Sequence, residues 1–156
     1  MEVPQLEKLP EKELKAAIKR TKQKPPKNLD ELFYNWHEET FEKVDCLTCA
    51  NCCKTTSPMF FEKDIERLSS YFKLRPAQFI EKFLFLDTDG IWALKSSPCP
   101  FLGSDNYCSV YDVRPKACRE FPHTNHRKMH THLHLIPQNI QICPAVIEIA
   151  KKLMAI

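Results

Sequence analysis

A dense group of cysteines constrains this chain more than any other feature of its sequence. Four thiols fall within eight residues, at Cys46, Cys49, Cys52 and Cys53. Four more are spread through the C-terminal half, at Cys99, Cys108, Cys118 and Cys143. A cysteine can pack as a small core hydrophobe, but eight of them in 156 residues are too many for that explanation. The fold and the chemistry therefore depend on what these sulfurs hold.

The surroundings of the cysteines favour metal over disulfides. The N-terminal stretch from Met1 to Lys8 is charged from its second residue and lacks the apolar run of a secretory signal. No segment approaches the roughly 20 apolar residues of a membrane-spanning helix. These features predict a cytoplasmic protein without a membrane partner. Thiols stay reduced in the cytosol, so metal ions are the expected partners of the cysteines.

The spacing of the first three cysteines fits a compact metal centre. A C-x2-C-x2-C run wraps an iron–sulfur cluster in bacterial ferredoxins, where a remote Cys-Pro supplies the last ligand. This chain offers two such pairs, Cys99-Pro100 and Cys143-Pro144. Zinc also binds C-x2-C pairs, with four ligands in a closed tetrahedral site. The expected cofactor is therefore a [4Fe–4S] cluster or zinc, and spacing does not choose between them.

Cys53 divides the eight thiols. Its side chain is expected to diverge from that of its neighbour Cys52, since adjacent side chains point to opposite sides of a strand or around a helix. The simplest partition gives two groups of four: Cys46, Cys49 and Cys52 with one remote cysteine, and Cys53 with the other three. A single bridged or cluster site that leaves some thiols out is the alternative.

Two arginines close to cysteines are candidates for a supporting role. Arg114 and Arg119 can donate N–H···S contacts that offset the negative charge of bound thiolates. They can also form ion pairs with Asp112 and Glu120, or bind a carboxylate or phosphate of a substrate. The sequence leaves these three interpretations open and identifies no catalytic residue.

Histidines form a second group near the cysteines, between residues 123 and 134. Residues 129–136 alternate in polarity, which predicts a strand with His130, His132 and His134 on one face. Imidazoles suit borderline metals, but polar residues on a solvated strand face are ordinary. His123 and His126 are the favoured ligand candidates, because they follow Cys118 closely.

The hydrophobic pattern predicts a mainly helical fold, small α+β in class, irregular and nucleated by metal. Helices are expected over 11–23, from an Asn28 cap with a Glu31 capping box to about 44, over 61–72, from Pro76 through Leu84, and after Pro144. Residues 91–95 predict a short strand. We expect an N-terminal helical arm over 1–43 and a cysteine-cluster metal-binding domain over 44–156.

Several functional classes are excluded or disfavoured. Two glycines, Gly90 and Gly103, cannot supply a glycine-rich phosphate loop or a dinucleotide fingerprint. The net charge is only +3, with its excess in the first 30 residues, which does not predict a nucleic-acid partner. No nucleophile–base arrangement stands out, and a protein partner is not identified.

The cysteine pattern resembles a known family. Cys46-x2-Cys49-x2-Cys52-Cys53, Cys99-Pro100-Phe101-Leu102, the segment from Cys108 to Pro122 and Cys143-Pro144 are together similar to the CxxCxxCC cysteine-cluster family of YkgJ-type zinc- or iron-chelating proteins. The resemblance covers about residues 44–148 and implies metal chelation through all eight cysteines. One branch resembles flagellin lysine methylases, in which an iron–sulfur cluster is implicated in methyl transfer from S-adenosylmethionine. A metal-binding protein is thus the leading hypothesis, and an iron–sulfur enzyme the alternative.

Overall fold

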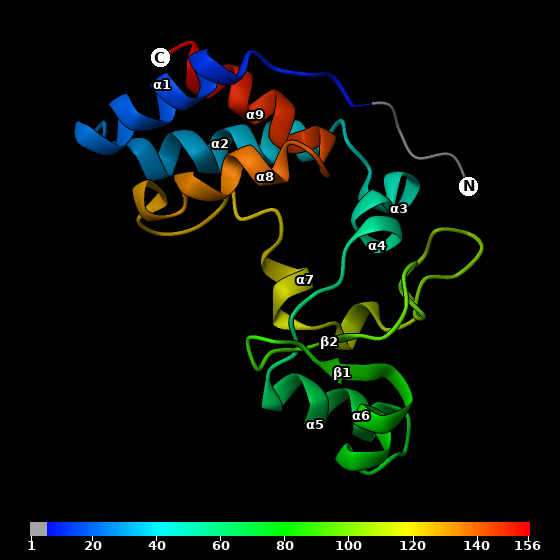
Figure 1. Cartoon of the computed structure of the whole chain (residues 1–156). Coiled ribbons are helices and arrows are strands. Elements are labelled where there is room, and N and C mark those ends of the chain that lie inside the picture. Colours follow the sequence, from blue (N-terminus) through cyan, green and yellow to red (C-terminus); the bar gives the residue numbers. More distant parts are fainter. Residues whose placement is uncertain (1–5) are drawn as a thin grey trace. The chain divides into compact units, whose positions relative to one another are not determined.

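The computed structural model describes residues 6–156, which are mostly helical and include one two-stranded antiparallel sheet (Figure 1). This confirms the predicted fold class. The expectation that no secretory signal is present falls partly on residues 1–5, outside the described range. Among the described residues, no helix combines the length and the apolar character needed to cross a bilayer.

The chain divides into two compact units, which we describe separately. Unit 2 is the continuous segment 50–121, and unit 1 combines the chain up to residue 49 with residues 122–156. The predicted division into an arm over 1–43 and a metal-binding domain over 44–156 does not follow these two units, and it stays a prediction.

Unit 1 is a helical unit formed by the two ends of the chain. Its elements are α1 (Glu11–Gln23), α2 (Leu29–Phe41), α3 (Cys46–Cys49), the 3-10 helices η2 (Met129–Thr131) and η3 (Leu133–Leu135), α8 (Ile136–Asn139) and α9 (Pro144–Met154). Helix α9 packs against both α1 and α2 (Figure 1). Its Val146, Ile149 and Leu153 are fully buried, as is Phe33 of α2. The two ends of the sequence therefore share one hydrophobic core.

The predicted strand over residues 129–136 is wrong. The segment forms η2, η3 and the start of α8 instead. Met129, Leu133 and Ile136 are its buried residues, and their spacing of four and three is helical. Because leucines at 133 and 135 also alternate with histidines, the short window matched a strand by coincidence. The Asn28 capping box is likewise absent, since its side chain makes no capping hydrogen bond, although α2 begins where expected.

Unit 2 is built around aromatic side chains. Its elements are α4 (Asn51–Thr55), α5 (Glu62–Tyr71), α6 (Pro76–Phe83), β1 (Leu84–Leu86), β2 (Trp92–Leu94), the 3-10 helix η1 (Tyr111–Val113) and α7 (Lys116–Glu120). Phe79 of α6 is fully buried at the centre of this core. The rings of Phe72 and Phe101 stack near it, with centroids 5.5 Å apart. The core thus packs α5 and α6 on the segment that follows Cys99.

The sheet of unit 2 is a hairpin. β1 pairs with β2 so that Leu84 lies opposite Leu94. Helix α6 ends at Phe83, one residue before the predicted end, because Leu84 enters β1. Asp87 closes the turn by accepting hydrogen bonds from the backbone N–H groups of Asp89 and Ile91, each 2.9 Å long. Gly90 adopts a φ of 77°, which explains why glycine occupies that position.

Candidate metal centre

The eight cysteines are all thiols in the structure. Unit 2 holds five of them: Cys52, Cys53, Cys99, Cys108 and Cys118. Unit 1 holds Cys46, Cys49 and Cys143. The predicted ligands are therefore found in both units, and the geometry of each set is described within its own unit.

Cys53 and Cys99 are joined through their backbones. Cys53 lies in α4, which follows Ala50 in the left-handed conformation with a φ of 46°. The Cys99 N–H donates a hydrogen bond of 2.8 Å to the Cys53 carbonyl oxygen. Helix α4 and the chain after β2 are thereby held together, with a cysteine on each.

A tight hairpin positions Cys108. The Gly103 N–H donates to the Tyr107 carbonyl and the Ser109 N–H to the Phe101 carbonyl, both at 2.8 Å. Leu102 and Cys108 form an antiparallel bridge between these bonds. A Cβ atom on Gly103 would lie 2.6 Å from Asp105 Oδ1, so a larger residue there would displace the Asp105 side chain. The hairpin therefore fixes where Cys108 lies relative to the chain that follows Cys99.

Cys118 is positioned by α7, and α7 is anchored by a buried carboxylate. Asp64 Oδ1 accepts hydrogen bonds from the Lys116 N–H at 3.1 Å and from Arg67 Nη2 at 2.8 Å. Arg67 also donates to the carbonyl oxygens of Val113 and Arg114, at 3.1 and 2.9 Å. These contacts tie the segment carrying Cys118 to helix α5.

Sequence reasoning missed this supporting role of Asp64 and Arg67. The available signal was weak: Asp64 stands three residues after Phe61, at the position where a side chain caps a helix start. It does so here, because its Oδ2 accepts a 2.9 Å bond from the Phe61 N–H.

Four of the five thiols of unit 2, those of Cys53, Cys99, Cys108 and Cys118, interact electrostatically. Burial raises the pKa of Cys118 to about 12, and negative charge on Cys53, Cys99 and Cys108 adds to the increase. Burial raises the pKa of Cys99 to about 11, with contributions from Cys53 and Cys108. Negative charge on Cys53 thus opposes the ionisation of Cys99, Cys108 and Cys118. Removing all four protons requires a compensating cation, which is how such sites couple metal binding to deprotonation.

The structure differs from the sequence expectation at Cys52 and Cys53. The Cys52 thiol donates a hydrogen bond to the Cys53 sulfur and lowers the pKa of Cys53 to about 7. Consecutive residues on a helix such as α4 are about 100° apart rather than on opposite sides, so rotation about χ1 brings the thiols together. The expected divergence of the two side chains is therefore wrong. The Cys52–Cys53 contact places one cysteine of each predicted group next to the other.

In unit 1, Cys49 and Cys143 interact electrostatically. Burial raises the pKa of Cys143, and negative charge on Cys49 adds to the increase. Cys46 and Cys49 are the first and last residues of α3. Asp45 fixes the start of this short helix by accepting bonds of 2.9 Å from the Leu47 N–H and the Thr48 hydroxyl.

The two Cys-Pro pairs share a local geometry. The Leu102 N–H donates to the Cys99 carbonyl oxygen and the Val146 N–H to the Cys143 carbonyl oxygen, both at 3.1 Å. The two amides that follow each proline also act against burial and lower the pKa of the thiol, those of Phe101 and Leu102 at Cys99 and those of Ala145 and Val146 at Cys143. Hydrogen bonds to sulfur stabilise a thiolate, and they tune metal and cluster sites.

The two arginines have different surroundings. Arg114 lies over the Tyr111 ring, 4.0 Å from its centroid, and donates to the Tyr111 carbonyl at 2.7 Å. Its positive charge opposes the increase in the pKa of Cys108 and Cys118, so it does contribute to the electrostatics of the thiols. The ion pair proposed with Asp112 does not form within the described residues.

Arg119 lines an open cavity of about 470 Å³ on unit 2. Lys63, Lys116 and Arg67 line the same cavity. Glu120, its expected partner, pairs with Lys116 at 3.6 Å instead. Over the described part of the chain, the guanidinium group of Arg119 forms no hydrogen bond or ion pair.

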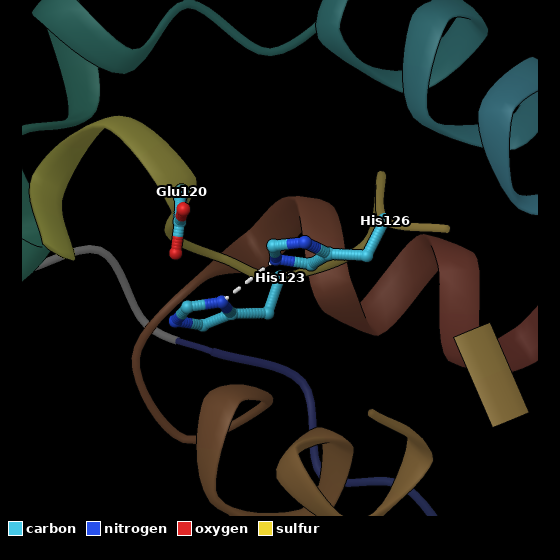
Figure 2. A group of neighbouring side chains, drawn as sticks. All are labelled: Glu120, His123 and His126. Atoms are coloured by element: carbon cyan, nitrogen blue, oxygen red, sulfur yellow. Dashed lines mark hydrogen bonds between the residues drawn. The ribbon is translucent and has the colours of Figure 1, made fainter. Parts of the chain in front are cut away.

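The histidines of unit 1 do not share a strand face, because the strand is absent. His123 and His126 are half-buried, with His123 Nδ1 3.0 Å from His126 Nε2 (Figure 2). The His126 ring stacks on that of His132, with centroids 4.2 Å apart. His130 and His134 are exposed.

Comparison with known proteins gives one match. The sequence profile of a family described as a putative zinc- or iron-chelating domain matches residues 45–141. Neither the comparison with curated proteins nor that with solved structures finds a match. The matched segment spans more than half of the chain and runs from the first cysteine cluster through Cys118. The chain therefore belongs to the CxxCxxCC family of zinc- or iron-chelating domains.

Proposed function

We propose that this protein binds metal in the reducing cytosol through two four-cysteine centres. Centre B consists of Cys53, Cys99, Cys108 and Cys118, and centre A of the remaining four, Cys46, Cys49, Cys52 and Cys143. The observation that carries the proposal is the match of residues 45–141 to a zinc- or iron-chelating domain, a segment that holds seven of the eight thiols. Within unit 2, burial first and then negative charge on Cys53, Cys99 and Cys108 raise the pKa of Cys118, and this opposition is relieved when the sulfurs share a cation.

The two centres suit different metals. The ligands of centre B come from four separate parts of unit 2, as in a closed tetrahedral zinc site. Centre A has the C-x2-C-x2-C run with a remote Cys-Pro, the arrangement that holds an iron–sulfur cluster in ferredoxins. Within unit 1, the interaction between Cys49 and Cys143 supports Cys143 as the remote ligand of centre A. We therefore assign zinc to centre B and a [4Fe–4S] cluster to centre A.

The backbone amides near three of the sulfurs support the same ligand set. They lower the pKa of Cys99, Cys143 and Cys108 against the effect of burial. Peptide donors offset the negative charge that four thiolates leave on a bound metal. The role that follows is in metal handling, or in presenting a metal-stabilised surface to another protein.

Paired variants test this function. Cys118→Ser should lose the zinc of centre B and keep the iron and sulfide of centre A, and Cys49→Ser should do the reverse. Metal content and visible absorption of anaerobically purified protein give the readout. Ser104→Ala, an exposed position in the same hairpin as Cys108, is the control and should keep both metals. Loss of both metals in each single variant would point to one joint centre, and unchanged content would remove these cysteines from the ligand set.

The unpaired Arg119 favours a second candidate, an iron–sulfur enzyme that uses S-adenosylmethionine. Arg119 follows Cys118 directly and lines the cavity with Lys63 and Lys116. Guanidinium and ammonium groups in an open cavity suit the carboxylate of such a substrate. In this role Arg119 would hold the substrate beside centre B, and the iron–sulfur cluster would occupy centre B in place of zinc.

Calorimetry separates this candidate from the first. Saturable binding of S-adenosylmethionine that weakens in Arg119→Ala would support the enzyme, with Lys73→Ala, at an exposed residue outside the cavity, as the control. No binding to the metal-loaded protein would leave the non-enzymatic function.

A further inference from the structure

A pair of half-buried histidines in unit 1, His123 and His126, is not among the ligands proposed for the two cysteine centres. We propose that His123 and His126 form an additional site for a borderline divalent cation such as Zn²⁺, with His123 Nδ1 and His126 Nε2 as the ligand atoms. Figure 2 shows the two rings facing each other through these nitrogens. The figure also draws Glu120, which ends α7 in unit 2.

The distance between the nitrogens fits a shared ion. They lie 3.0 Å apart, joined by a hydrogen bond in which one ring donates and the other accepts. Two nitrogens each about 2.0–2.1 Å from a tetrahedral Zn²⁺ lie about 3.3–3.4 Å apart. To bind an ion in place of the shared proton, the rings must separate by a few tenths of an ångström and turn so that both nitrogens point at an ion beside the line that joins them. Neutral imidazole is also the donor that Zn²⁺, Ni²⁺ and Cu²⁺ share.

The loop that carries the pair is held at several points. The Pro122 carbonyl accepts a 3.0 Å bond from Asn139 Nδ2, and the buried Thr124 hydroxyl bonds His37 Nδ1 at 2.8 Å. At the other end of the loop, the Asp30 carboxylate accepts the N–H groups of Lys128 and Met129, both at 2.9 Å. A loop fixed in this way supports a preformed binding geometry.

Two features orient the rings themselves. His123 adopts a φ of 63°, a left-handed conformation that is uncommon for a residue with a side chain. The His126 ring stacks almost parallel to that of His132, with an interplanar angle of 4°. Backbone strain of this kind persists where the surrounding structure enforces it, often at binding sites.

The site is accessible to ions. His126 lines an open cavity of about 390 Å³ together with the acidic residues Asp30 and Glu31. The Asp30 carboxylate is engaged with the loop, whereas Glu31 has no hydrogen bond or ion pair with any described residue. Arg127 lines the same cavity and offsets one of the two negative charges. The remaining negative charge favours the approach of a cation.

The inference is tested by zinc titration of protein whose cysteine centres are already loaded. Calorimetry should show one further equivalent of Zn²⁺ in the wild type. His123→Gln and His126→Gln should each weaken this binding by at least about tenfold, the smallest effect typical even of changes to residues around a metal site. His134→Gln, at an exposed histidine of the same unit, is the matched control and should bind as the wild type does.

Nitrogen-15 correlation spectra of the histidine rings identify the ligand atoms. Zinc should shift the signals of His123 Nδ1 and His126 Nε2 and leave those of His130 and His134 in place. Absence of a further equivalent, equal binding by all variants, or equal loss in His134→Gln would overturn the proposal. The iron and zinc content of the cysteines, measured on the same samples, reports separately on the function proposed above. Unchanged content together with an unchanged circular dichroism spectrum shows that a variant lost this site and not its fold.

Discussion

Replacing Asp64 by asparagine should destabilise unit 2 by about 2–4 kcal/mol, a range set by the loss of a buried charge-assisted bond. The Asp64 side chain is almost fully buried and receives three donors. They are the Phe61 N–H at 2.9 Å, Arg67 Nη2 at 2.8 Å and the Lys116 N–H at 3.1 Å. The substitution changes one atom and tests the link between α5 and the segment that carries Cys118.

The magnitude follows from the donors. Asparagine keeps one carbonyl oxygen and presents an N–H group where the other oxygen stood. In either orientation, at least one donor of the protein then faces another donor, and a hydrogen bond to a charged group, worth about 1.5–3 kcal/mol, is lost. Arg67 also loses the charge of its partner. This second loss is moderate, because about a third of the Arg67 side chain is exposed to solvent.

Urea unfolding of metal-loaded protein measures the effect. The chain has two tryptophans, Trp36 in α2 and Trp92 in β2. In a Trp36→Phe background the fluorescence of Trp92 therefore reports unit 2 alone. Glu62→Gln, at an exposed residue two positions earlier in the first turn of α5, is the matched control and should cost less than about 1 kcal/mol, the contribution of an exposed charge at a helix start.

Equal midpoints for Asp64→Asn and Glu62→Gln would refute this reasoning. That result would mean that the segment around Cys118 is held by its own packing or by metal alone. A destabilised Asp64→Asn that also loses zinc more readily than the control would support the role of Asp64 in positioning Cys118.

Two further predictions concern the core and the hairpin of unit 2. Phe79→Ala should cost about 3–5 kcal/mol of unfolding free energy, because Phe79 is fully buried against other aromatic rings. Phe85→Ala, at an exposed ring of β1, should cost much less. Similar melting temperatures for the two variants would contradict the assigned core. Gly103→Ala should cost about 1–3 kcal/mol of unfolding free energy, because the new Cβ would displace the Asp105 carboxylate from the Tyr107 N–H. Zinc affinity should fall as well, because the distorted hairpin carries Cys108. Unaltered stability and zinc retention would show that the hairpin tolerates a side chain there.

The helices could be predicted from the sequence because their period and end signals agree. Residues 11–23 carry Leu14, Ala17 and Ile18 at helical spacing and end before Pro25, and α1 has these bounds. In α9, a first-turn proline precedes the buried apolar residues, as predicted. Such local signals suffice when the apolar stripe is long enough to exclude the two-residue period of a strand.

The failures come from short windows and long-range contacts. Residues 129–136 fit both the two-residue period of a strand and the 3.6-residue period of a helix, and only packing in unit 1 selects the helix. The contact between Cys52 and Cys53 depends on the helical geometry of α4, which a five-residue element does not reveal in its sequence. The anchoring of Lys116 by Asp64 joins residues 52 positions apart, and no local pattern encodes such a pairing.

The metal site could be predicted in its residue types more fully than in its arrangement. The eight cysteines and their family follow from spacing, and the matching family profile confirms the family. The electrostatic effect of Cys53 on Cys99, Cys108 and Cys118 could be identified only from the fold, because these thiols come from different parts of unit 2. The donors to Cys99 and Cys143 were likewise visible only once the backbone was placed.

The most direct test of the account is the metal content of the wild-type protein, purified without oxygen and without added metal. We expect about one zinc atom, about four iron atoms and about four acid-labile sulfides per chain, and a brown colour from the cluster. Thiols of the native protein should resist alkylation until a chelator or acid releases the metals. A folded, reduced protein that holds neither zinc nor iron and reacts with the alkylating agent at all eight cysteines would contradict the central claim.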